Sequence, residues 1–529
     1  MKDDASDADI AAFASRYGLS VHPNSAWSTH DKLEVADVPA ADERAILDLI
    51  EHDPLVEHAE PMVLYRAFFA PNDPLYDTKQ WHLKKVQAES GWDYTCGRGV
   101  TVAVIDTGIA CFDSGPFSKG TDLEGTRCEG GYDFVNNRPE AADDHGHGTH
   151  VAGTIAQTTN NGMGTAGLAF CATLMPIKVL SKGGFGTVAN VAEGIRFAAD
   201  TGAQVINMSL GGPIKSKILE DAVVHANKKG VLIVAAAGNS GRSVGYPAAY
   251  PGVFAVSATD SNDKIAWFSS RGPEVGIGAP GVNVTQQTIC EGGKNKCEIF
   301  GTFNGTSMAS PHVAGAAAMV VSMGITDADS VRSTLEATAV PKPDEKNLYG
   351  AGILDAGAAV ARAHWLHVGM RLAALVALFG LIAARIKRGK GSLALSPLAI
   401  VGALVGAVGL LPVAPVLHLG SLGFVRPVVE LLMRPLGEWD LLFGAGLHRW
   451  LPLANAIPAM TGVAFLFGSR RLRPGVGGFA LGSAALLAQI AFSADVAFGM
   501  GSVALRIWMV LNALVCLWLA QMCLDKKSA

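Results

Sequence analysis

"VTVAVID", residues 100–106, is a run of β-branched and small apolar residues that ends in an aspartate. Four more apolar runs follow, and helix-like stretches such as 188–200 and 217–229 lie between them. A strand that is apolar along its whole length is buried on both faces, as in a parallel sheet covered by helices. The pattern therefore predicts an α/β fold with a doubly wound, mostly parallel sheet. The four further runs are residues 173–180, 204–210, 230–238 and 252–258.

Charge is unevenly distributed along the 529-residue chain. Residues 366–529 carry 14 Lys and Arg against 5 Asp and Glu, a net of +9. Because the whole chain carries −5, residues 1–365 carry −14. An acidic N-terminal part disfavours nucleic acid as a partner, since phosphate binding needs a basic face. The length predicts at least two domains.

Two polar stretches are candidates for chemistry. Ligands of such sheets bind beyond the carboxyl ends of the strands, where Asp106 lies, although an Asx turn that closes the strand is the alternative. The stretch "DDHGHGTHVAGT" (143–154) contains His145, His147 and His150. Closely spaced imidazoles are typical of a zinc site, and one of them can equally be a general base. The triplet alone leaves both interpretations open.

A third stretch, "NGTSMASPHVAGAAAMVV" (304–321), places Ser307 where a helix of small residues begins. A hydroxyl there is either an N-cap or a nucleophile whose oxyanion the helix N-terminus stabilises. Serine becomes a nucleophile when imidazole takes its proton, and imidazole needs a carboxylate to fix its tautomer. Asp106, His147 and Ser307 supply these groups in the chain order of subtilisin. An α/β-hydrolase would place serine first within G-x-S-x-G, which "GTSMA" lacks.

Six motifs carry a resemblance to a known family: "VAVIDTGIA" (102–110), "HGHGTHVAGTIA" (145–156), "NMSLGG" (207–212), "AAAGNSG" (235–241), "NGTSMASPHVAGAAA" (304–318) and "YGAGILDAGAAV" (349–360). On these motifs, residues 75–362 resemble the subtilisin-like serine proteases, or subtilases, of the bacterial secreted branch. The resemblance implies a serine endopeptidase that hydrolyses protein or peptide substrates and uses no catalytic metal.

The resemblance also assigns catalytic roles. It makes His147 the base, with His150 as a structural neighbour and His145 solvated in the preceding loop, so the histidine triplet is interpreted as a base rather than as zinc ligands. Asn239 is placed in the oxyanion hole beside the Ser307 backbone N–H. The implied catalytic residues are Asp106, His147, Ser307 and Asn239.

Substrate contacts follow from the same resemblance. Two backbone edges would hold an extended substrate between them, and Gly245 falls at the floor of the main pocket. A glycine there favours a large apolar side chain before the cut. The implied edge residues are Ser209, Leu210 and Gly211 on one side and Gly184, Phe185 and Gly186 on the other.

The stretch "TTNNGMGTAGLA" (158–169) resembles the subtilase loop that binds a structural calcium ion. The ion would have only oxygen ligands, as Ca²⁺ prefers, and a glycine-rich turn without metal is the alternative. The implied ligands are the Asn161 side chain, the carbonyls of Thr159, Met163 and Thr165, and the side chains of Gln80 and Asp122.

Residues 1–70 resemble the small α+β inhibitory propeptide of subtilases, notably in "DPLVEHAEP" (53–61). The resemblance implies a self-inhibited precursor in which this segment ends between Tyr65 and Pro74. A permanent accessory domain is the alternative.

Six of the eight cysteines precede residue 300. Outside a reducing compartment an even number suggests disulfides, whereas buried free thiols are the alternative. The expected pairs are Cys290–Cys297, Cys111–Cys128 and Cys96–Cys171.

Residues 366–525 are predicted to form an all-α transmembrane region in contact with lipid. Each of five segments is apolar on all faces and about as long as the 20 residues that cross a bilayer, which disfavours a second soluble domain. Charges interrupt 413–450, where we expect an interfacial or re-entrant helix. The five segments are residues 366–384, 393–411, 451–468, 476–494 and 503–524.

Basic clusters set the expected orientation. Five spans put residues 384–391, 469–475 and 525–529 on one side, which is cytoplasmic because Lys and Arg are retained there. The protease part is then extracytoplasmic. The N-terminus "MKDDASDADIAAF" has no apolar core, so we expect export to depend on an upstream segment or, failing that, on the first span.

Two other classes of function compete with a membrane-tethered protease. A non-catalytic scaffold would not need all four implied catalytic residues. A transporter or sensor has little support, because few charges lie within the spans and Arg371 and Arg506 lie near their ends.

Overall fold

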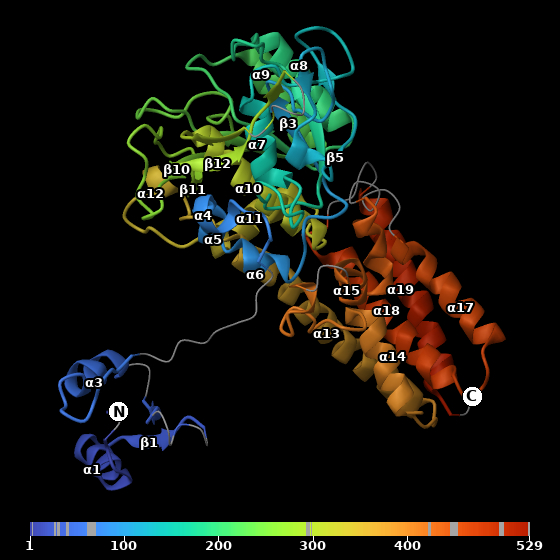
Figure 1. Cartoon of the computed structure of the whole chain (residues 1–529). Coiled ribbons are helices and arrows are strands. Elements are labelled where there is room, and N and C mark those ends of the chain that lie inside the picture. The colour runs from blue at the N-terminus through green and yellow to red at the C-terminus, as the bar shows by residue number, and fades with distance from the viewer. Residues whose placement is uncertain are drawn as a thin grey trace. The chain divides into compact units, whose positions relative to one another are not determined.

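The computed structural model describes the chain except residues 3, 26–27, 29–31, 39–41, 61–69, 293–296, 298, 422–424, 445–452, 497–501 and 527–529. The chain divides into two compact units, residues 1–67 and 68–529 (Figure 1). The expected end of the N-terminal segment, between Tyr65 and Pro74, falls partly outside the described residues. The second unit contains both the α/β body and the apolar C-terminal helices.

The N-terminal unit is a small α+β structure. Ser6 caps its first helix through a reciprocal capping box with Asp9, and Phe13 is buried beneath it. The two strands pair antiparallel, with Ser20 opposite Asp37. The unit therefore has the predicted α+β class. Its elements are α1 (Asp7–Tyr17), β1 (Ser20–Pro23), β2 (Glu34–Asp37) and α3 (Glu43–Ile50).

A parallel sheet forms the centre of the second unit. The predicted run 100–106 becomes β3 (Thr101–Asp106), and the pairings along the sheet are parallel. The doubly wound α/β fold is thus confirmed. In spatial order the strands are β11 (Val275–Pro280), β10 (Val253–Thr259), β9 (Leu232–Ala236), β8 (Val205–Met208), β3, β7 (Thr173–Lys178) and β5 (Arg127–Cys128), and β6 (Tyr132–Asp133) pairs with β7.

Helices cover both faces of this sheet, which explains why its strands are apolar throughout. In β3, Val102 and Val104 belong to the core beneath α7 and α10, whereas Ala103 and Ile105 belong to the core beneath α8 and α9. Alternate residues of a strand point to opposite faces, so a strand between two helical layers needs apolar residues at every position. The helices are α7 (His147–Ala156), α8 (Val188–Asp200), α9 (Lys217–Lys228) and α10 (Thr306–Ser322).

Three disulfides and several short elements complete the body. The pairs are Cys96–Cys171, Cys111–Cys128 and Cys290–Cys297, so all three expected bridges are confirmed and the free-thiol alternative is wrong for these residues. The remaining elements are α4 (Tyr76–Lys79), α5 (Trp81–Lys85), α6 (Ala88–Trp92), β4 (Phe117–Ser118), η1 (Thr121–Leu123), β12 (Val284–Gln287), β13 (Cys290–Glu291), β14 (Phe300–Phe303), α11 (Ala328–Thr338) and α12 (Lys346–Tyr349).

The C-terminal region contains, among its described residues, three helices that are long and apolar enough to cross a membrane, α13 (Ala356–Arg388), α18 (Arg473–Phe492) and α19 (Ser502–Leu524). This differs from the five expected spans. The segments 393–411 and 451–468 instead contain α14 (Pro397–Val408) and α17 (Ile457–Phe467), of 12 and 11 residues. Helix α14 ends early because Gly409 leaves the helical conformation before Pro412. The short elements here are η3 (Leu419–Ser421), α15 (Arg426–Leu432), η4 (Leu436–Leu442) and η5 (Leu453–Ala456).

Glycines allow α14 and α18 to touch backbone to backbone. A Cβ on Gly478 would lie 1.9 Å from the Ala399 carbonyl oxygen, and one on Gly482 would lie 2.1 Å from that of Ala403. Stripes of small residues at a spacing of four are how helices approach one another in lipid. Larger side chains at either glycine would separate the two helices.

The basic clusters gather at one end of this helical region. The Lys526 N–H donates to the Ser392 carbonyl at 2.9 Å, which joins the C-terminal end of α19 to the turn after α13. A Cβ on Gly477 would lie 2.6 Å from that of Cys523, so the start of α18 lies there too. Clusters 384–391, 469–475 and 525–526 therefore share one end.

The described parts of the charged segment, residues 413–421 and 425–443, pack against the α/β body. Glu430 binds Arg98 at 2.9 Å, and His418 binds Asp93 at 2.6 Å. The expected interfacial or re-entrant helix is instead the pair of short helices α15 and η4. Glu430 and His418 face charged groups of the body that are distant in the sequence, whereas Glu438 pairs with Arg371 of α13.

Candidate active site

The expected catalytic residues come together at the carboxyl edge of the sheet. Asp106 is the last residue of β3, and Asn239 lies in the loop that follows β9. His147 and Ser307 are the first and second residues of α7 and α10. Strand ends and helix N-termini meet at this edge because the sheet is parallel.

Asp106 and His147 are in direct contact. The His147 Nδ1–H donates to Asp106 Oδ1 at 2.7 Å, and the Asp106 side chain is completely buried. Burial by itself would lower the pKa of His147, but the charge and hydrogen bond of Asp106, with the charge of Asp143, raise it above its usual value. With its proton on Nδ1, neutral His147 leaves Nε2 able to accept a proton.

Asp143 holds the start of α7 in place. Its buried carboxylate accepts hydrogen bonds from the Gly146 N–H at 3.0 Å, the Thr149 N–H at 2.9 Å and the Thr107 hydroxyl at 2.8 Å. Gly146 has φ +99°, a conformation that side chains rarely adopt. A carboxylate at a helix N-terminus satisfies free N–H groups and favours the helix dipole, so this residue fixes the position of His147.

Ser307 and Asn239 lie close together at the start of α10. The Ser307 hydroxyl donates to the Ser209 carbonyl at 3.1 Å, so it must rotate to reach an imidazole. Asn239 Oδ1 accepts from the Thr306 N–H at 2.9 Å, which leaves Nδ2 to point elsewhere. A Cβ on Gly305 would lie 3.3 Å from Asn239 Nδ2 and 3.6 Å from the Ser307 nitrogen. The two nitrogens therefore lie close together at the start of α10, as the two donors of an oxyanion hole must.

A cleft of about 540 Å³ runs beside His147. Six of the seven expected substrate contacts line it, namely Ser209, Leu210, Gly211, Gly184, Phe185 and Gly186. Gly245 is not among the described lining residues, and its N–H is bonded to the Ala237 carbonyl at 3.0 Å. Its neighbours Tyr246 and Pro247 line the cleft in its place.

Sequence reasoning missed several residues of this site. Tyr246, Val191 and Leu219 line the cleft from a loop, α8 and α9, and no local pattern marks them. Lys178 could have been identified from the sequence, since a charged residue at the end of an apolar strand is expected at the functional edge of a parallel sheet. Its buried ammonium donates to the Thr107 carbonyl at 2.7 Å and to Asp144 at 2.6 Å, which ties the end of β3 to the loop before His147.

The three clustered histidines have different surroundings. His145 is exposed and lines the cleft, and His147 binds Asp106. His150 is buried, and its Nε2–H lies 3.0 Å from the Gly301 carbonyl. Burial lowers the pKa of His150 to about 3. Of the three, His147 is the one that presents its ring to a carboxylate at the sheet edge.

Three of the six expected calcium ligands, Asp122, Asn161 and Thr165, are in direct contact. The Asp122 carboxylate is completely buried and accepts from Asn161 Nδ2 at 2.8 Å and the Thr165 N–H at 2.9 Å. Burial raises the pKa of Asp122 to about 7. Gln80 reaches the same loop through two bonds with Ala166. A buried carboxylate beside an amide side chain supplies two oxygen ligands of the type that a hard cation such as Ca²⁺ prefers, once the amide turns its oxygen inward.

The fold and the site are those of a serine protease with a doubly wound α/β body. The model of the subtilase family matches residues 97–352. The chain is 41% identical over 274 residues to thermitase of Thermoactinomyces vulgaris, covering 51% of this chain and 92% of thermitase. It is 44% identical over 282 residues to subtilisin Savinase of Lederbergia lenta, covering 53% and 97%.

A solved structure shows the same likeness. A protease from Pseudoalteromonas arctica superposes with a TM-score of 0.50 at 33% identity, covering 55% of this chain and 99% of that chain. The chain belongs to the subtilase family, and it is a serine endopeptidase.

Proposed function

We propose that this protein is a membrane-tethered serine endopeptidase, made as a self-inhibited precursor, in which Asp106, His147 and Ser307 are the catalytic triad. The observation that supports the triad most is the 2.7 Å bond between His147 and the buried Asp106, at the sheet edge where Ser307 begins α10. This bond sets the tautomer in which Nε2 accepts a proton.

The proposed reaction begins with rotation of the Ser307 hydroxyl from Ser209 toward His147. His147 Nε2 takes the hydroxyl proton as Oγ attacks the peptide carbonyl carbon. The oxyanion accepts hydrogen bonds from the Ser307 N–H and Asn239 Nδ2. The imidazolium, stabilised by Asp106, then gives its proton to the leaving amine, and water releases the acyl group by the same route.

We propose that the substrate lies extended between Ser209–Gly211 and Gly184–Gly186. Extended peptides bind through main-chain hydrogen bonds, and their side chains enter pockets that give selectivity. The cleft walls include Leu210, Val191 and Tyr246, so a large apolar side chain before the cut is the proposed preference.

We propose that Ca²⁺ is bound by the Asp122 carboxylate, the Asn161 and Gln80 side chains, and the carbonyls of Thr159, Met163 and Thr165. The ion would crosslink the loop 158–169 to the start of the body and neutralise a buried negative charge. Rotation of the Asn161 amide would turn its oxygen toward Asp122. The buried position of that carboxylate is the observation that supports the ion.

We propose that the C-terminal helices anchor the enzyme with its body outside the cytoplasm. The support is that three basic clusters lie at one end of the helices and the body at the other. Retention of Lys and Arg on the cytoplasmic side then places the body on the opposite side.

Labelling with a fluorophosphonate probe tests this function. The purified full chain should label weakly, and cleavage after the N-terminal unit should increase labelling and peptide hydrolysis together. Ser307→Ala is the matched control and should remain unlabelled. Strong labelling of Ser307→Ala would assign the nucleophile elsewhere, and equal labelling before and after cleavage would argue against inhibition by residues 1–67.

A further inference from the structure

The helices of the proposed membrane region and the active site lie at opposite edges of one parallel sheet. Asp106 ends β3, whereas Arg98 and Gly99 precede its first residue. Glu430 of the C-terminal region binds Arg98 at 2.9 Å, and a Cβ on Gly99 would lie 1.9 Å from the Leu441 carbonyl oxygen. The C-terminal region therefore docks at the amino edge of the sheet, and catalysis takes place at its carboxyl edge.

Helix α10 gives a second measure of this separation. Ser307 lies in its first turn, and the carbonyl of its last residue, Ser322, accepts a hydrogen bond from Arg434 of the C-terminal region. Fifteen residues of helix extend over about 22 Å at 1.5 Å per residue. The six residues of β3 extend over about 20 Å. The lengths of α10 and β3 therefore both place the catalytic edge of the sheet about 20 Å from the edge where the C-terminal region docks.

The connection between the body and the membrane helices has no hinge. Helix α13 begins with Ala356, Ala359 and Val360 inside the core of the body, and continues without a break into a stretch whose Leu372 and Val376 are exposed. A continuous helix transmits its direction from one end to the other. The orientation of the body is therefore fixed by α13.

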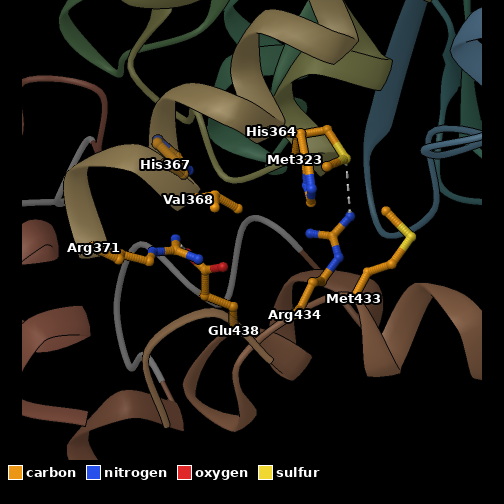
Figure 2. A pocket seen from close by; sticks show the side chains of 8 residues that line it. All are labelled: Met323, His364, His367, Val368, Arg371, Met433, Arg434 and Glu438. Atoms are coloured by element: carbon orange, nitrogen blue, oxygen red, sulfur yellow. Dashed lines mark hydrogen bonds and ion pairs between the residues drawn. The ribbon is translucent and has the colours of Figure 1, made fainter. Parts of the chain in front are cut away.

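Residues from α13, from the end of α10 and from the segment 433–438 line a small pocket at the junction beside α13 (Figure 2). Arg371 of α13 pairs with Glu438, and Arg434 donates to Met323 Sδ at 3.4 Å. These residues and His367 surround a cavity of about 10 Å³, which has room for one water molecule at most. Arg434 therefore joins the C-terminal region to the end of α10 in the body, and the Arg371–Glu438 pair joins α13 to the segment that carries Arg434.

We propose that the enzyme cleaves polypeptide segments that stand about 20 Å or more from the membrane surface, meaning soluble proteins and the distal parts of anchored ones, and spares segments next to the lipid. This inference rests on the proposed membrane anchorage and protease function. A substrate chain at 3.3–3.6 Å per residue needs at least about 6 fully extended residues to reach the cleft. A flexible Gly/Ser chain needs about 16, since its mean reach grows as about 5–6 Å × √n.

Anchored model substrates of graded length test the inference. The full chain, after removal of its N-terminal unit, would be reconstituted into vesicles with single-span substrates. Each substrate carries one cleavage sequence behind a Gly/Ser spacer. The three spacers have about one quarter, the same number, and twice the number of residues that a flexible chain needs to reach the cleft. We expect the substrate with the shortest spacer to be cut at least 10-fold more slowly than the one with the longest, and the intermediate one within a few-fold of the longest. Equal rates with the shortest and the longest spacer would overturn the inference.

A soluble peptide with the same cleavage sequence distinguishes a failure of the proposed reach limit from a failure of the proposed protease function. If it is cut in the same vesicles while spacer length has no effect, the inference about reach is wrong and the protease function stands. If it is not cut, the proposed function fails and the inference fails with it. Ser307→Ala vesicles supply the background rate.

Energy transfer to the lipid gives a measurement that does not depend on cleavage. A donor dye attached to Ser307 by a fluorophosphonate should transfer less excitation energy to acceptor dyes on the lipid than a donor dye on Asp329→Cys. The reason is that Ser307 is expected to lie farther from the lipid than Asp329. Asp329 is exposed at the start of α11, next to Thr326 and Asp327, whose N–H groups bind the Asp495 carbonyl. Equal transfer from the two positions would place the active site at the membrane surface and overturn the inference.

Discussion

At the scale of single residues, the proposal makes His147 and Ser307 indispensable and His145 dispensable. Ser307→Ala and His147→Ala should each lower turnover by about 10⁶-fold, the scale measured for loss of triad members in subtilisin. His145→Ala should change it by only a few-fold, because this exposed side chain lines the cleft without a bond to Asp106. Steady-state hydrolysis of a peptide ester and amide would measure all three. Comparable losses for His145→Ala and His147→Ala would contradict the assignment.

The pH dependence follows from the state of His147. Catalysis needs the neutral imidazole, and Asp106 and Asp143 raise the pKa of His147 against the effect of burial. Activity should therefore fall as the pH drops through a value above the usual 6.5, rather than below it. A profile of kcat/KM between pH 5 and 9 measures this. An acid limb centred below pH 6.5 would show that burial outweighs the two carboxylates.

At the scale of elements, a buried histidine pair should make α10 sensitive to acid. His312 Nδ1–H donates to the Met308 carbonyl at 2.8 Å, so its Nε2 accepts from His82 at 2.8 Å. Burial lowers the pKa of His312 to about 4. The unfolded chain binds a proton here below pH 6.5 and the folded chain does not, so stability is lost as the pH falls from 6.5 toward 4, at about 1.4 kcal/mol per pH unit.

Denaturant unfolding between pH 7 and 4.5 would measure this loss. His312→Gln removes the titrating group while keeping a hydrogen-bond acceptor for His82, so its stability should decline less steeply with falling pH. His145→Gln, at an exposed position, should keep the wild-type slope. Parallel slopes for all three proteins would remove His312 from the explanation.

Calcium should act on the loop that contains Asn161. An ion that binds the native state raises the free energy of unfolding by mass action, by about 2.7 kcal/mol at 100-fold its Kd. Calcium should therefore raise the thermal midpoint of the full chain, and Asp122→Asn and Asn161→Ala should each reduce that rise. Asp221→Asn, in an exposed pair with Lys217, is the matched control. A midpoint that chelator leaves unchanged would argue against the site.

Sequence patterns predicted the strands well and the C-terminal packing poorly, for physical reasons. Runs such as 100–106 are apolar at successive positions, and this local pattern is enough to indicate a strand that is buried on both faces. The strand β11, "VGIGAP" (275–280), was not predicted because its two glycines interrupt the run of large apolar residues. The partners of Glu430 and His418 could not be foreseen, since charge pairs between positions far apart in the sequence leave no local periodicity.

At the scale of the whole molecule, the arrangement of basic clusters predicts which positions an impermeant thiol reagent reaches. Ser392→Cys and Ser469→Cys, at the basic end, should resist labelling in intact cells and react after permeabilisation. Asp329→Cys, on the body, should react in both. The two free cysteines, Cys516 and Cys523, are buried and give low background. Labelling of Ser392→Cys in intact cells would reverse the orientation.

If the enzyme is anchored as proposed, the unbroken course of α13 has a consequence for how it can leave its membrane. Many anchored proteins are shed when another protease cuts an extended stalk between the anchor and the ectodomain. Proteases bind extended backbone, and residues 356–388 are helical from the core of the body to the basic end. An enzyme whose body continues directly into its helices through α13 has no extended stalk there for another protease to cut. We therefore expect it either to stay on the cell surface or to leave in vesicles together with its helices.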